Sequence, residues 1–152
     1  MGLENIKELF DFESFDYFYH ETEEGNGERI MEEGLLVDGT NIIDTNNILF
    51  TTTVPITPDM VESSQSFIDY INSEVGSNTL RDVSEMVIIC TEKGNARHLV
   101  DEFNQTINEH FYEGIIYPNY IMGYIDMHDM EFHPNEKYEF AEEIVADDSY
   151  GI

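Results

Sequence analysis

Basic residues are scarce in this chain of 152 residues, which has six lysines and arginines against 33 aspartates and glutamates and a net charge of −27. A surface of this sign repels phosphate polymers and anionic lipid, which argues against direct nucleic-acid binding and against binding to a membrane surface. Solubility accounts for some of the acid, but a catalytic domain needs far less, and adaptation to high salt fits poorly with the abundant Ile, Phe, Tyr and Asn. The excess therefore favours a partner protein with a positive surface.

Cysteine is nearly absent. The single Cys90 excludes an internal disulfide and a cysteine-based zinc site. No apolar run approaches the length of a transmembrane helix, and the acidic N-terminus does not have the pattern of a signal peptide. We therefore expect a protein of the reducing cytoplasm that does not enter a membrane.

Tryptophan is missing, but ten phenylalanines and nine tyrosines supply enough apolar surface for the core of one domain. We expect a single domain over residues 1–152. Residues 136–152 form an acidic C-terminal segment, for which we expect either a short helix around 140–146 or a mobile tail.

Several catalytic motifs are also missing. The chain has no Gly-x-Ser-x-Gly elbow and no Gly-x-x-x-x-Gly-Lys loop, which argues against a serine hydrolase of that type and a phosphate-binding loop. On an extended backbone Asp129, Glu131 and His133 would share one face, where three metal ligands could meet. Their spacing matches no zinc signature, so we assign no metal.

The most informative stretch runs from an aromatic strand at 15–20 into His20-Glu21-Thr22, then into a short helix-like segment that Gly34 closes. Together with Ile48 to Thr53, this order resembles the opening of ADP-ribosyltransferase-like domains, including poly- and mono-ADP-ribosyltransferases and RNA 2′-phosphotransferases. The resemblance covers about a quarter of the chain. In this family the motif is usually His-Gly-Thr or His-Gly-Ser, whereas here Glu21 replaces the glycine.

The resemblance implies NAD as cofactor and transfer of ADP-ribose to a protein or nucleic-acid target. His20 would hold the ribose and act in catalysis, with Thr22 beside it. Arg29 would offset the charge of Glu21 against the two phosphates, and the strand that contains Thr52 would line the same site. No motif fixes the family's catalytic glutamate, for which Glu113 and Glu131 are the two candidates.

A second hypothesis comes from charge. A non-catalytic, acidic inhibitor could cover the basic groove of a nucleic-acid enzyme by mimicking nucleic acid, as phage anti-restriction and anti-CRISPR proteins do. Its affinity should fall steeply with salt.

The fold expected in either case is α+β, with a mixed or split sheet of about six strands and three or four helices, as in ADP-ribosyltransferase-like domains. Periodicity predicts helices at 3–11, 58–73 and 95–110, strands at 15–20, 48–53, 86–91 and 120–126, a loop at 37–47 that contains a short extended piece at 42–43, and a turn at 115–118.

Overall fold

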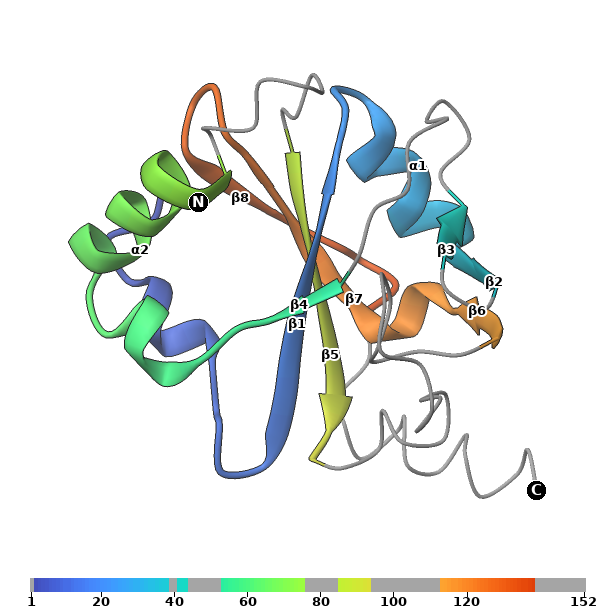
Figure 1. Cartoon of the computed structure of the whole chain (residues 1–152), viewed down its shortest axis with the longest axis horizontal. Coiled ribbons are helices and arrows are strands. Elements are labelled where there is room, and N and C mark those ends of the chain that lie inside the picture. Colours follow the sequence, from blue (N-terminus) through green and yellow to red (C-terminus); the bar gives the residue numbers. More distant parts are fainter. Residues whose placement is uncertain (1, 39–40, 44–52, 76–84, 94–112, 139–152) are drawn as a thin grey trace.

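The computed structural model describes residues 2–38, 41–43, 53–75, 85–93 and 113–138, which form two antiparallel sheets and two α-helices (Figure 1). In spatial order, the larger sheet consists of β4 (Thr53–Pro55), β1 (Phe15–Thr22), β5 (Glu85–Glu92), β7 (Ile121–Asp126) and β8 (Glu131–Pro134). The smaller sheet consists of β3 (Asn41–Ile43), β2 (Leu35–Asp38) and β6 (Glu113–Ile116).

The expected α+β class is confirmed. Eight strands are described, where about six were expected. Every described pairing is antiparallel, and the strands form two sheets, so of the expected mixed or split arrangement the described strands have the split one.

Strand β5 is the centre of the larger sheet. Its continuous apolar run predicts a strand covered on both faces, and residues 85–91 are all buried. It pairs with β1 along the whole length of both strands, from Phe15 opposite Glu92 to Thr22 opposite Glu85.

The two faces of this sheet support two separate cores. Tyr17 and Tyr19 of β1 lie in the core that η1 (Ile6–Leu9), η2 (Pro58–Val61) and α2 (Ser64–Tyr70) help to form. Phe18 lies in the other core, with residues of α1 (Asn26–Glu33) and of the smaller sheet. The aromatic strand predicted at 15–20 is therefore confirmed, and its side chains alternate between the two cores. In Figure 1, the α2 layer and the layer of α1 and the smaller sheet lie on opposite sides of the large sheet.

Helix α1 ends as expected but begins differently. Gly34 has φ +86, and its N–H donates to the Ile30 carbonyl at 2.7 Å, which terminates the helix. Thr22 precedes α1 and carries a hydroxyl that can cap a helix start. Its hydroxyl instead accepts from the Asn26 side chain at 3.0 Å, and Gly25 occupies the cap position with φ 89.

Other predicted elements are corrected. The helix expected at 58–73 is split into η2, α2 and the π-helical turn η3 (Ile71–Val75). The break between η2 and α2 lies at Ser63, because this residue adopts an extended conformation and its hydroxyl accepts from the Ser66 N–H. The loop at 37–47 contains the hairpin β2–β3, in which the extended pair 42–43 is confirmed. The turn expected from 115 overlaps the end of β6 and is followed by η5 (Pro118–Tyr120). The helix at 3–11 is reduced to η1.

Three predictions fall wholly or partly on other parts of the chain. The helix at 95–110 lies outside the described residues, as does the strand at 48–53 except for Thr53, and so does the C-terminal segment from 139 onward.

Candidate functional site

The strand register brings the polar residues of the large sheet into two rows on one face. His20, Val87, Tyr124 and His133 are successive partners across β1, β5, β7 and β8. Thr22, Glu85, Asp126 and Glu131 form the next row. Since paired residues point to the same side of a sheet, His20, Thr22 and Glu131 share one face.

His20, the residue on which the transferase hypothesis depends, is completely buried, with an exposed fraction of 0%. It lies between Thr53 of β4 and Val87 of β5, both of which are also buried. A dinucleotide could touch this imidazole only after neighbouring groups moved. In this conformation the ring is therefore part of the interior.

A carboxylate does lie near His20, but it is already used. Glu85, 4% exposed, accepts from the Gly25 N–H at 2.9 Å and from the Gly27 N–H at 2.6 Å. These are amides at the N-terminal end of α1, where backbone N–H groups have no partners within the helix. A carboxylate there also interacts favourably with the helix dipole. Glu85 thus attaches α1 to the sheet.

The two candidate catalytic glutamates lie apart from His20. Glu131 is exposed at the start of β8, three strands from β1, which corresponds to about 14 Å at the usual strand spacing. Glu113 begins β6 in the other sheet, opposite Asp38. The described contacts bring neither residue to His20, so the catalytic role of each stays a prediction.

The remaining predicted residues add little to a nucleotide site. Arg29 is half-buried on α1, and Thr22 is buried beside Glu85. Thr52 lies outside the described residues. The structure therefore collects His20, Thr22 and Glu85 in one neighbourhood, but as interior groups.

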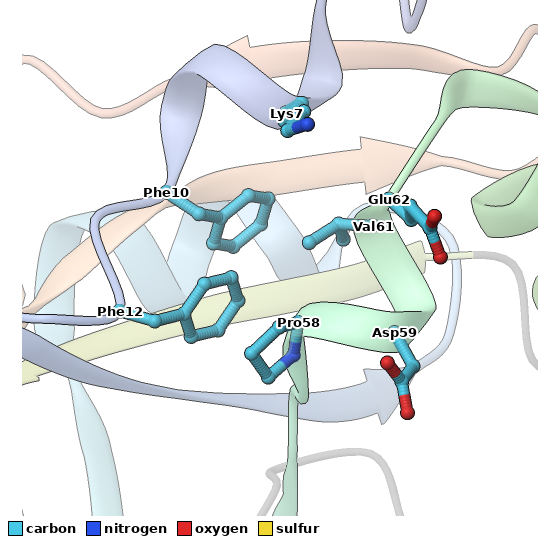
Figure 2. Close-up of a pocket in the computed structure, with 7 residues that line it drawn as sticks. All are labelled: Lys7, Phe10, Phe12, Pro58, Asp59, Val61 and Glu62. Atoms are coloured by element: carbon cyan, nitrogen blue, oxygen red, sulfur yellow. The ribbon is translucent and has the colours of Figure 1, made fainter.

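A pocket of about 400 Å³ lies elsewhere, between η1 and η2, and we call it the η1–η2 pocket (Figure 2). Its lining residues are Lys7, Phe10, Phe12, Pro58, Asp59, Val61 and Glu62. In Figure 2 the Pro58 and Val61 side chains lie between the two phenyl rings and the Asp59 and Glu62 carboxylates, which point away from the rings, and Lys7 lies at a separate edge. The sequence analysis missed this pocket, although two phenylalanines among acids just before the first strand were a usable signal.

The aromatic wall of the η1–η2 pocket is held in place by Tyr17. Phe10 and Phe12 are stacked with ring centres 5.6 Å apart, and each meets Tyr17 edge-on. Tyr17 itself is buried, and its hydroxyl accepts from the Asp11 N–H at 2.8 Å. Lys93 also stabilises the position of Phe12, because its Nζ donates a hydrogen bond to the Phe12 carbonyl at 2.7 Å. The wall therefore has a defined position before any ligand arrives.

Acidic side chains dominate the exposed surface. Within the described ranges fourteen acids are exposed, against three lysines, and one of these, Lys137, is paired with Glu32 at 2.8 Å. The exposed acids are Glu4, Glu8, Asp11, Glu13, Glu24, Glu28, Glu32, Glu33, Asp59, Glu62, Asp69, Asp129, Glu131 and Glu136. Four of them lie in residues 4–13, the segment that contains η1 and the Lys7, Phe10 and Phe12 side chains of the pocket.

Comparison with known proteins gives no relative, because no family model, no curated protein and no solved structure matches the chain. None of the helices in the described ranges combines the length and apolar character that a membrane span requires. The functional argument therefore depends on the geometry and charge described above.

Proposed function

We propose that this protein is a non-catalytic, acidic binding protein that docks onto the basic surface of another protein. The observation that carries the proposal is the ratio of fourteen exposed acids to three exposed lysines in the described part of the chain. A basic groove that normally holds nucleic acid is the kind of surface that such a field matches, so the protein would act as a nucleic-acid mimic of the anti-restriction or anti-CRISPR type.

The charges act mainly at long range. An acidic surface accelerates encounter with a positive partner and orients it, and added salt weakens the effect because the screening length shortens to about 3 Å at 1 M salt. A protein that relied on this field alone would bind many basic partners weakly. Specific binding needs an anchor in which a partner side chain is desolvated.

The η1–η2 pocket supports such an anchor. The Phe10 and Phe12 rings offer aromatic surface to a cation, and Asp59 and Glu62 add carboxylates to the far rim of the same pocket. An arginine of the partner fits this combination, since its planar guanidinium stacks on aromatic rings and binds carboxylates through two N–H groups. Lys7 on the rim opposes the incoming charge, so its removal should strengthen binding.

The transferase function is not the one we advance. It requires His20 to face a nucleotide, and the ring is buried, while the nearby Glu85 carboxylate is bonded to the start of α1. NAD-dependent chemistry stays a prediction.

The experiment compares two double variants of equal charge. Asp59→Asn/Glu62→Gln alters the η1–η2 pocket, and Glu24→Gln/Glu33→Gln removes two exposed acids near the two ends of α1. Both lower the net negative charge by two, so they share any long-range loss. Partners captured from host lysate at about 50 mM NaCl are identified, purified and titrated against each variant at several salt concentrations.

Support requires a discrete partner that salt releases, for which this protein competes with nucleic acid, and that binds the pocket variant at least about tenfold more weakly than the α1 variant. Lys7→Gln should bind more tightly than wild type. A partner retained unchanged at about 500 mM NaCl contradicts the charge-based proposal. Equal weakening by the two double variants rejects the pocket as the anchor.

A further inference from the structure

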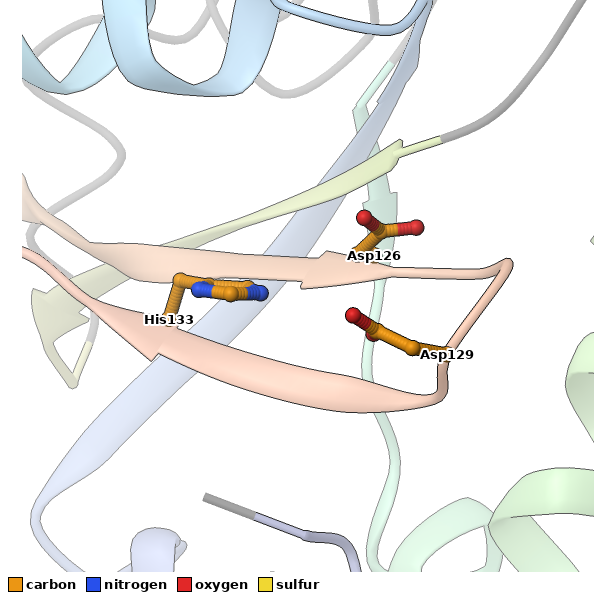
Figure 3. Close-up of side chains that lie close together, drawn as sticks. All are labelled: Asp126, Asp129 and His133. Carbon is orange, nitrogen blue, oxygen red and sulfur yellow. The ribbon is translucent and has the colours of Figure 1, made fainter.

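We propose that Asp126, Asp129 and His133 form a site for a divalent first-row metal ion at the β7–β8 hairpin. One potential ligand atom from each side chain lies within 4.8 Å of the others. Figure 3 shows the His133 ring with one edge toward the two carboxylates. This site is separate from the η1–η2 pocket and does not depend on the proposed binding function.

The hairpin turn positions both carboxylates. Asp126 ends β7, and its carbonyl accepts from the Met130 N–H at 2.8 Å, which closes the turn with Met130 at φ 56. Asp126 Oδ1 accepts from the His128 N–H at 2.9 Å, and Asp129 Oδ1 accepts from the Glu131 N–H at 3.0 Å. Each carboxylate is thus oriented through one oxygen and keeps its second oxygen for a cation.

His133 supplies an independent observation. Its Nε2 atom is shielded from solvent and has no hydrogen-bond partner within the described part of the chain. A buried polar atom without a partner is costly, and such atoms in folded proteins call for an explanation such as an ion. The ring is held by stacking on Tyr124, with centres 4.8 Å apart and planes at 16°. A metal ion between this ring and the carboxylates would satisfy the nitrogen.

The dimensions agree with one ion in the centre. Metal–nitrogen and metal–oxygen bonds of about 2.0 to 2.2 Å keep any two ligand atoms within about 4.4 Å, so the present limit of 4.8 Å needs only a small closure. Two carboxylates alone would suit magnesium, calcium or manganese, but the imidazole shifts the preference toward zinc and the other first-row ions that bind imidazole. Three protein ligands also leave a coordination position open to water or to a partner's side chain.

This trio differs from the one considered from the sequence. An extended backbone would group Asp129, Glu131 and His133, but Asp129 lies in the turn and β8 begins only at Glu131. The turn folds Asp129 back toward Asp126 at the end of β7, so Asp126 takes the place of Glu131.

Zinc titration by calorimetry tests the site. Excess Mg²⁺ in every sample occupies the diffuse acidic surface, and wild type is compared with His133→Gln and with Asp126→Asn/Asp129→Asn. Two controls are matched: His128→Gln changes an exposed histidine of the same turn, and Asp59→Asn/Glu62→Gln removes the same charge elsewhere. The asparagines keep the oxygens that accept the turn N–H groups, and circular dichroism confirms that each variant is folded.

We expect one zinc ion per chain in wild type, binding at least about tenfold weaker in the two site variants, and a change of less than about twofold in both controls. A shift of the His133 ring resonances in the histidine NMR spectrum should accompany saturation. The proposal is overturned if wild type shows no saturable binding, if His128→Gln weakens binding as much as His133→Gln, or if the two double variants behave alike.

Discussion

Replacing Glu85 with alanine should cost about 3 kcal/mol of unfolding free energy, although the change removes a buried charge. The Gly27 N–H would lose a charged acceptor at 2.6 Å inside the protein, which costs about 1.5–3 kcal/mol for a hydrogen bond of this kind. Gly25 is exposed, so its N–H can hydrogen-bond to water instead, and loss of its bond to Glu85 adds only about 0.5–1 kcal/mol. Loss of the charge at the helix start adds about 0.3–1 kcal/mol.

One effect acts in the opposite direction. Taking a carboxylate out of water is unfavourable, and its removal returns part of that energy. Glu85 is 4% exposed, so this offset applies, and we place the net cost at about 3 kcal/mol, in the lower part of the summed range of about 2.3–5 kcal/mol. Glu85→Gln should cost about 1–2 kcal/mol, because its amide oxygen can still accept one of the two N–H groups.

Urea unfolding at neutral pH measures these values, with Glu92→Gln as control. Glu92 is at the other end of β5, is half-buried, and should change stability by less than about 0.5 kcal/mol. Amide exchange of Gly27 should also accelerate in both Glu85 variants. The reasoning fails if Glu85→Gln matches the control, or if the Gly27 amide keeps its protection.

Three further outcomes are expected. Gly34→Ala should destabilise by about 1–3 kcal/mol in urea unfolding, since its φ of +86 and contact with the Ile116 carbonyl leave no room for a Cβ; an unchanged midpoint would contradict this. Burial raises the pKa of Cys90 from 9.0 to about 11, so the thiol ionises earlier in the unfolded chain. As pH rises from 9 to 11, the unfolding free energy of wild type should therefore fall by up to about 3 kcal/mol more than that of Cys90→Ala, which urea unfolding at each pH measures. If the transferase hypothesis holds, millimolar NAD should shift amide signals near His20, and unchanged spectra would remove it.

Local patterns revealed much of the framework. The apolar run of β5, the aromatic strand that is β1 and the glycine that ends α1 each depend on short-range chemistry, and each is confirmed. The partner of the α1 N-terminus was beyond such reasoning. Glu85 is about sixty residues away in sequence, and only the β1–β5 register brings its carboxylate within hydrogen-bonding distance of the Gly27 N–H.

The candidate sites were harder for the same reason. From sequence alone, a histidine at the end of an aromatic strand can be predicted either to bind a ligand or to be buried in the interior. The elements that cover the strand determine the outcome, and here they bury His20. The metal trio required knowing where the β7–β8 turn bends, because the turn, and not the alternation of an extended strand, brings Asp129 toward Asp126. The η1–η2 pocket joins segments about fifty residues apart.

The pairing of β1 with β5 also bears on how the chain is made. Partners in these strands are separated by 63 to 77 residues, so β1 leaves the ribosome without its main neighbour. At about 5–20 residues per second, that interval lasts about 3 to 15 seconds. During this time an aromatic segment with Phe15, Tyr17, Phe18 and Tyr19 is exposed to chaperones and to other nascent chains. Slowing translation between residues 22 and 85 should therefore lower the soluble yield, whereas slowing it after residue 126 should not.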